Sequence, residues 1–236
     1  MSNIFITSDE HYGHVNWKNG GGILHLAKRP FSDIIEMREA LIQRHNEVVP
    51  PSQGYLTIHV GDMFWMSMES WEATRILDRL NGRHAFMFGN HDELIEKSSD
   101  LQSKFDWVYG ENKAGGAKLL RWNKHKLTLN HFAQRVWEGS HKGHWHVYGH
   151  SHNALPGLGK SFDIGVDGNN FYPWSIEQIE KKMSTLEQHH TIDNTGRPGG
   201  EDIVKESLSQ GLVDGYKESR FDRSYPKFDH LPEGSH

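Results

Sequence analysis

Five short motifs along the chain carry oxygen and imidazole nitrogen atoms that can bind metal ions, and each motif follows a stretch that reads as a β-strand. In chain order they are Asp9-Glu10-His11, Gly61-Asp62, Gly89-Asn90-His91-Asp92, His131 and Gly149-His150-Ser151-His152. This mixture of carboxylate, amide and imidazole groups suits Mn, Fe, Ni or Zn better than Ca. The layout therefore predicts a site for two divalent metal ions at the ends of several strands.

The spacing within the motifs indicates how such a site would be arranged. Residues two apart in an extended strand point to the same side, so Asp9 and His11 can reach one metal ion, and His150 and His152 repeat the pattern. The carboxylate of Asp62 could bridge two metal ions. Two cations held by only two carboxylates keep excess positive charge, which binds phosphate and favours a bridging hydroxide near neutral pH. We therefore expect hydrolysis of a phosphoester by attack of a metal-bridging hydroxide.

Each motif has an alternative explanation when it is taken alone. Asp-x-His and Gly-Asp are common, and turn formation at a strand end explains either of them. Gly-Asn-His-Asp is more specific, whereas Gly-His-Ser-His is weakened because the chain holds 18 histidines. Gly61, Gly89 and Gly149 stand just before ligands, where we expect the chain to need backbone angles that other residues resist. The ordered set at strand ends, rather than any one member, favours the metal site.

The elements that must position these motifs alternate in the first half of the chain. We expect strands at 3–7, 55–60 and 84–88, and helices at 33–47, capped by Ser32, and at 68–80. This alternation indicates a parallel or mostly parallel sheet. The second half reads as a second sheet packed on the first and a final helix, with strands at 107–109, 117–122, 126–129, 144–148 and 162–166 and the helix at 175–186.

The composition limits the class of protein. The chain has 236 residues, and we expect a catalytic domain over 1–190 with an extension over 191–236 that is partly ordered at best. The net charge of −5 gives no general attraction to nucleic acid or to an anionic membrane. The absence of cysteine excludes a disulfide framework, a thiol nucleophile and a thiolate metal site. With no signal peptide and no membrane-spanning run in the sequence, we expect a cytoplasmic protein.

Taken together, the motifs resemble those of the calcineurin-like metallophosphoesterase superfamily, and most closely those of its small single-domain members from bacteria and their viruses. The resemblance covers residues from about 3 to 186. It implies an α/β fold, a four-layer α/β/β/α sandwich, with a dinuclear site for which Mn is the most favoured metal. It also implies two ligand sets that share Asp62: Asp9, His11, Asp62 and His152 for the first metal ion, and Asp62, Asn90, His131 and His150 for the second.

The same resemblance gives His91 a role other than metal binding. It would lie over the phosphate as general acid for the leaving oxygen, or as a hydrogen-bond donor to the developing charge. Protein Ser/Thr phosphatases of the superfamily continue past Gly-Asp with an Asp three residues on and then an Arg, whereas Trp65 and Met66 stand there in this chain. This departure argues against a phosphoprotein phosphatase. Asp92 could orient His91 instead, or could cap the helix that begins there, and the sequence favours neither.

Other side chains near the motifs have two interpretations each. His14 could contact substrate or pack a loop. Arg135 could bind phosphate and Trp137 could stack on a base, or they could be a surface residue and a packing residue. His144 and His146 could line the approach to the metal ions or face solvent. Structural roles are expected for Arg29, His59 and His84.

The favoured substrate is a small phosphomonoester or phosphodiester, and a nucleotide is one candidate. A metal-dependent DNA or RNA nuclease is the second interpretation, and the acidic net charge counts against it. A binding scaffold without turnover on the same fold is the third, and it is weakened because neither a ligand nor His91 is missing. The expected location is the cytoplasm of a bacterium or of a phage-infected cell, and the oligomeric state is left open.

Overall fold

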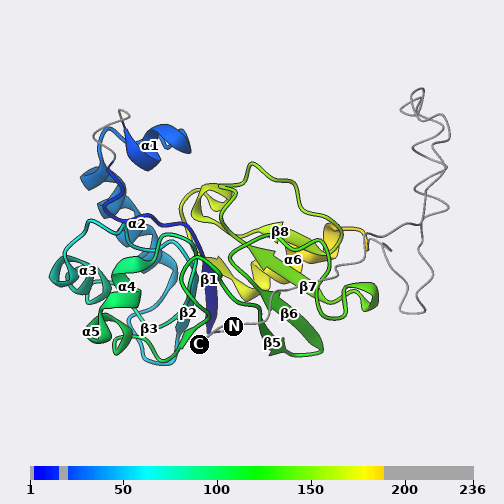
Figure 1. The fold of residues 1–236 in the computed structure, drawn as a ribbon. Helices are drawn as coiled ribbons and strands as arrows, with labels where there is room; N and C mark the ends of the chain where they lie inside the picture. The colour runs from blue at the N-terminus through cyan, green and yellow to red at the C-terminus, as the bar shows by residue number, and fades with distance from the viewer. Residues whose placement is uncertain (1–2, 16–20, 189–236) are drawn as a thin grey trace, which may run out of the picture. The chain divides into compact units, whose positions relative to one another are not determined.

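The computed structural model describes residues 3–15 and 21–188, and these form a mixed α/β structure (Figure 1). Within the described residues there are two β-sheets and six α-helices, so the predicted α/β class is confirmed. The extension predicted for 191–236 lies outside the described residues. No helix in the described part of the chain is long and apolar enough to cross a membrane.

The first sheet has the strand order β4-β3-β2-β1-β9. Its first four members in that order are parallel to one another, and β9 runs antiparallel to β1. Because the carboxyl ends of parallel strands meet at one edge, the segments after β1, β2 and β3 are brought together there. The strands are β1 (Ile4–Thr7), β2 (Leu56–Val60), β3 (Arg83–Met87), β4 (Val108–Tyr109) and β9 (Trp174–Ser175).

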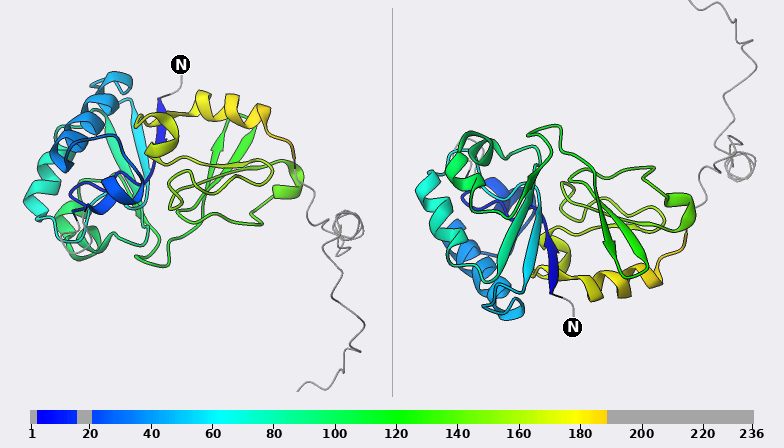
Figure 2. Two further views of the ribbon diagram at one scale, coloured as in Figure 1. Left: turned by 90° about the horizontal axis from the view of Figure 1, so that it is seen from above. Right: turned by 90° about the horizontal axis from the view of Figure 1, so that it is seen from below.

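The helices of the first half lie together on one side of β1, β2 and β3 in the views of Figures 1 and 2. They share one buried cluster with Phe86 and Phe88, to which α2 contributes Met37 and Leu41 and α3 contributes Ile76. This cluster holds the helices against the sheet. The helices are α1 (Gly22–Leu26), α2 (Ile34–Val48), α3 (Ser70–Leu77), α4 (Glu93–Lys97) and α5 (Ser99–Gln102).

The start of α2 differs from the expectation by one residue. Asp33, not Ser32, is the N-cap, because its Oδ1 accepts hydrogen bonds of 2.8 Å from the backbone N–H groups of Ile35 and Glu36. The hydroxyl of Ser32 donates to Glu36 instead, at 2.5 Å. A carboxylate at this position also interacts favourably with the helix dipole.

The second sheet has the order β5-β6-β7-β8. The β5–β6 pair is an antiparallel hairpin that turns at Asn123, which has a positive φ of 51°. The β6–β7 and β7–β8 pairs are parallel, so the segments after β6 and β7 again lie at one edge. The strand predicted at 162–166 is shorter and displaced, since the chain enters a 3₁₀ turn at Val166–Asn169. The strands are β5 (Lys118–Trp122), β6 (His125–Leu129), β7 (Trp145–Tyr148) and β8 (Ser161–Asp163).

A second buried cluster joins the two sheets and the last helix, α6 (Ile176–Thr185). The first sheet supplies Ile6 and Ile58, the second supplies Leu127 and Val147, and Ile179 of α6 is fully buried in the same cluster. Apolar burial on this scale is the main favourable term in folding. It fixes the second sheet against the first, as expected, whereas the strand expected at 107–109 in the second sheet is β4 of the first.

Candidate metal centre

The predicted metal-binding residues stand at the strand ends described above, in an unusual backbone conformation. A positive φ is rare for residues other than glycine and is found where the surroundings enforce it, often at functional sites. Among the predicted ligands it occurs at Asp9 (61°), His11 (51°), Asp62 (58°), His150 (65°) and His152 (47°). The strand ends therefore turn sharply at the ligands themselves.

The first group of possible ligands consists of Asp9, His11 and His152, whose ligand atoms all lie within 4.8 Å of one another. Asp9 and His11 are buried, and Nε2 of His11 is a buried atom with no hydrogen-bond partner in the described residues. Buried polar atoms are almost always paired in native proteins. A metal ion bound at this nitrogen would satisfy it, so these residues fit a metal site.

The second group consists of Asp62, His131 and His150, whose ligand atoms meet the same 4.8 Å limit. Oδ1 of Asn90 lies 3.0 Å from Nε2 of His131 and 2.8 Å from Nδ1 of His150, so the amide oxygen belongs to this group. The other ring nitrogen of His131 is 2.8 Å from the carbonyl oxygen of Val60. That contact fixes the ring so that Nε2 faces the group.

Asp62 lies between the two groups. Its Oδ2 is 3.6 Å from Nε2 of His11 and 3.4 Å from Nε2 of His131, while its Oδ1 accepts a 2.9 Å hydrogen bond from the backbone N–H of His91. Burial alone would raise the pKa of Asp62, but the hydrogen bond and charge of His131 and the charge of His11 hold it below its usual range. The carboxylate is therefore ionised and faces both groups.

Other pKa values in the cluster also depart from their ordinary range. Burial raises the pKa of Asp9 to about 7. Burial would lower the pKa of His131, but its hydrogen bond to Asp62 and the nearby Asp9 raise it to about 9. Metal ligands must lose their protons, so a divalent cation bound here would compete with protons at Asp9 and His131.

The three glycines before the ligands are required mainly by close approach. A Cβ added to Gly61 would lie 2.5 Å from Nδ1 of His131, and one added to Gly89 or Gly149 would collide with a carboxylate oxygen of Asp62 or Asp9. Only Gly61, with a φ of 91°, also has a positive φ. The expectation that all three need special backbone angles is therefore wrong for Gly89 and Gly149.

Asp92 neither orients the His91 ring nor caps α4. Its Oδ2 accepts hydrogen bonds from the backbone N–H groups of Asp62 (2.9 Å) and Gly89 (2.6 Å), and its Oδ1 accepts one from Met63 (3.1 Å). No cap hydrogen bond is formed at the start of α4. Both interpretations of Asp92 are therefore wrong, since the side chain is fully buried and joins the loops after β2 and β3.

A buried ion pair that none of the sequence motifs indicated supports His152. Oδ2 of Asp167 lies 2.8 Å from Nδ1 of His152, and both carboxylate oxygens of Asp167 accept hydrogen bonds of 2.8 Å from Arg29. Arg29 also donates to the backbone carbonyls of Asp9 (2.6 Å) and Glu10 (3.0 Å). Such partners orient metal-binding histidines and strengthen them as ligands. Arg29 thus has the structural role expected for it, and it has that role beside the first candidate ligand group.

His91 is partly exposed beside a set of rings. The centroid of its ring is 5.8 Å from that of His11 and 4.9 Å from that of Trp65. His14 stacks on Trp65, with centroids 3.4 Å apart and planes 6° apart, and its centroid is 5.1 Å from that of His11. The structure therefore brings His14 and Trp65 together with His91, while substrate contact by His14 stays a prediction.

The remaining candidates lie apart from the ligands. Arg135 is exposed, and in the described part of the chain no contact joins it to the two ligand groups. Trp137 is buried and donates a 2.8 Å hydrogen bond to the carbonyl of His144, which favours the packing interpretation. His146 is fully buried, so it does not face solvent. His59 is a hydrogen-bonded core residue, as expected, with Nδ1 2.5 Å from Oε1 of Glu10.

Comparisons with known proteins find a similar sequence and a similar fold, but neither of these proteins has a named activity. No family model matches the chain. The uncharacterized protein MJ1445 of Methanocaldococcus jannaschii is 26% identical over 201 residues, covering 82% of this chain and 98% of the relative. The crystal structure of AQ665, a protein of unknown function from Aquifex aeolicus, matches with a TM-score of 0.56 and 20% identity, covering 76% of this chain and 98% of that one. The second match concerns the fold alone.

Proposed function

We propose that this protein is a dinuclear metal-dependent phosphoester hydrolase of the calcineurin-like metallophosphoesterase type. The observation that supports it best is the place of Asp62, whose Oδ2 lies 3.4–3.6 Å from a histidine of each ligand group. Two adjoining groups with a carboxylate between them are the arrangement required for two metal ions that share a ligand. The ordered motifs at strand ends support the same proposal.

Two observations support the four-layer α/β/β/α sandwich of that superfamily as the finer form of the α/β fold. Helices α2–α5 cover one side of the first sheet, and the second sheet and α6 share a core with its other side. Both sheets direct the carboxyl ends of parallel strands to the ligands, through β1, β2 and β3 in one and β6 and β7 in the other.

The residues divide between two metal ions. Asp9, His11, Asp62 and His152 would hold one, and Asp62, Asn90, His131 and His150 would hold the other. The mixed oxygen and nitrogen ligands favour Mn, with Fe, Ni and Zn as the other candidates. When bound, the metal ions would supply charge stabilisation of the phosphate and an activated water nucleophile.

His91 would assist the leaving group. Its backbone is fixed by the hydrogen bond to Asp62, and its partly exposed ring lies beside the ligand His11. A ring in this place can donate a hydrogen bond or a proton to the oxygen that leaves phosphorus, an effect of about 10²–10⁴-fold in rate.

The substrate we favour is a small phosphomonoester or phosphodiester, with nucleotides included. The nuclease alternative remains weaker, because the chain carries a net charge of −5 and binding to nucleic acid rests largely on cationic side chains. The scaffold alternative is also weaker, because every expected ligand lies in one of the two groups and His91 stands beside them.

The test is hydrolysis of nitrophenyl phosphate mono- and diesters by chelator-stripped protein, with Mn, Ni or Zn added back. We expect activity to depend on added metal, and Asn90→Ala and His91→Ala each to lower kcat about 10²-fold or more. His25→Ala, at an exposed histidine of α1, is the matched control and should keep full activity. Full activity in both site variants would show that the assignment is wrong.

A further inference from the structure

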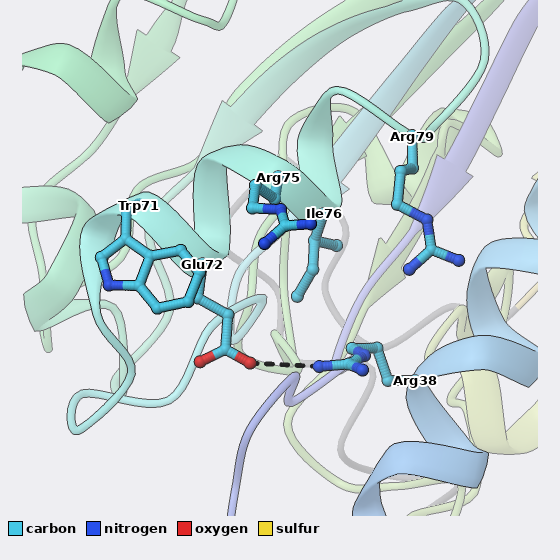
Figure 3. Close-up of a pocket in the computed structure, with 6 residues that line it drawn as sticks. All are labelled: Arg38, Trp71, Glu72, Arg75, Ile76 and Arg79. Carbon is cyan, nitrogen blue, oxygen red and sulfur yellow. Dashed lines mark hydrogen bonds and ion pairs between the residues drawn. The ribbon is translucent and has the colours of Figure 1, made fainter.

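A hollow between α2 and α3 shares no residue with the candidate metal centre (Figure 3). Its volume is about 200 Å³. Figure 3 shows Arg38, Arg75 and Arg79 around Ile76, with the guanidinium of Arg38 paired to Glu72. The residues that line it are Arg38 from α2, Trp71, Glu72, Arg75 and Ile76 from α3, and Arg79 just beyond it.

The arginines of this hollow outnumber the carboxylates that neutralise them. Arg38 pairs with Glu39 at 3.0 Å and with Glu72 at 3.1 Å, and Arg79 also pairs with Glu39. Arg75 has no ion pair in the described residues, and its guanidinium lies 5.9 Å from the ring centroid of Trp71. The guanidinium of Arg75 is thus available to bind an anionic ligand, while Glu39 and Glu72 hold the guanidinium groups of Arg38 and Arg79 in place.

An exposed aromatic ring stands beside the free cation. Trp71 is 59% exposed, an unusual state for a tryptophan in a folded protein. The buried side chain of Ile76 adds apolar surface to the lining of the hollow. A ligand that combines a flat ring with an anion would match this surface.

We propose that this hollow binds a nucleoside monophosphate, with its phosphate on Arg75 and its base on Trp71. Arginine binds phosphate through paired N–H donors, and Arg75 carries the positive charge that Glu39 and Glu72 leave unneutralised. Base stacking on an exposed aromatic ring is a common way to bind a nucleotide without selecting one base. This inference goes beyond the proposed hydrolase, since it uses no metal ligand.

The experiment is calorimetric titration of chelator-stripped, full-length protein with AMP, adenosine and inorganic phosphate. AMP should bind one to one and more tightly than either fragment. Arg75→Gln should weaken AMP binding about 10-fold or more, because a charged hydrogen bond is lost. Trp71→Leu should weaken it roughly 5- to 150-fold through lost stacking. A short single-stranded oligonucleotide in a separate titration distinguishes a free nucleotide from one within a chain.

Controls separate this site from the metal centre. Arg121→Gln, at an exposed arginine of β5, should bind AMP like the unchanged protein. Arg75→Gln and Trp71→Leu should keep the hydrolysis of nitrophenyl phosphate, so failure of the proposed hydrolase would not imitate failure here. The proposal is overturned if stripped protein does not bind AMP, or if both variants bind it with unchanged affinity.

Discussion

At the residue scale, Trp65 is the aromatic side chain nearest to the ring of His91 in the described structure. It lies 4.9 Å from His91, and its flat stack with His14 limits its own movement. No carboxylate among the described residues makes a hydrogen bond to the His91 ring, so aromatic packing is what restricts it. Trp65 stands at the sequence position that carries an Asp in the protein Ser/Thr phosphatases of the superfamily that this chain resembles. At that position this chain has a packed aromatic ring in place of a carboxylate.

This packing predicts how Trp65 variants behave. Trp65→Ala should lower kcat about 10-fold for an alkyl phosphate, whose poor leaving group needs a proton, and much less for a nitrophenyl phosphate. Trp65→Phe keeps a ring beside His91 and serves as the matched control. Steady-state kinetics with both substrates measure the difference. An equal loss with both substrates would assign Trp65 to substrate binding rather than to positioning His91.

Gly89 makes a second prediction at this scale. A Cβ on Gly89 would collide with Oδ1 of Asp62 and lie 2.9 Å from the backbone nitrogen of the same residue. Gly89→Ala should therefore cost about 1–3 kcal/mol of stability and weaken Mn binding. Gly54→Ala is the control, since its Cβ would meet only the Ser52 hydroxyl, at 3.6 Å. Urea unfolding and metal titration test both variants, and equal effects would remove close approach as the reason for Gly89.

At the element scale, the Arg29–Asp167 ion pair joins the segment after α1 to the 3₁₀ turn Val166–Asn169, 138 positions apart in sequence. The pair reaches both strand ends of the first ligand group, through His152 and through the carbonyl of Asp9. It therefore acts on the placement of ligands from two elements at once. Its burial makes the loss of one partner more damaging than the loss of an exposed pair.

The prediction for this pair is a loss of metal affinity. Asp167→Asn leaves Nδ1 of His152 without a charged partner and should weaken Mn binding about 10- to 100-fold. Arg29→Lys, which cannot make the paired contact, should act in the same direction. Asp106→Asn, in the exposed ion pair with Arg83, is the control and should leave metal binding unchanged. Calorimetric titration with Mn decides, and unchanged affinity in both buried variants would make the pair purely structural.

At the scale of the whole molecule, the sequence was most informative about the type and order of the elements. The alternation of strands and helices predicted the parallel first sheet, and the order of motifs predicted which strand ends meet. It failed where contacts are remote or compete. Arg29 was not linked to Asp167 and His152, because it lies 138 positions before Asp167 in sequence. Asp92 had two local interpretations, and both were wrong because its carboxylate accepts hydrogen bonds from backbone N–H groups of the loop after β2.

Global stability should depend on pH through the histidines packed between α2 and the first sheet. Burial lowers the pKa of His45, His59 and His84 to about 3, against about 6.5 in an unfolded chain. Each is neutral in the folded protein and takes up a proton on unfolding below pH 6.5. Their contribution to stability is therefore present above about pH 6.5 and is lost as the pH falls toward 3.

His45 allows this linkage to be isolated, because its Nε2 lies 3.0 Å from the carbonyl oxygen of Asn81 and glutamine can donate a similar hydrogen bond without titrating. Between pH 7.5 and 5.0 the unchanged protein should lose about 2 kcal/mol relative to His45→Gln, since each pH unit below 6.5 contributes about 1.4 kcal/mol. Urea unfolding at the two pH values measures this difference. His25→Gln, at an exposed position, should show no such change. A stability difference between His45→Gln and the unchanged protein that is independent of pH would mean that His45 is not held neutral by burial.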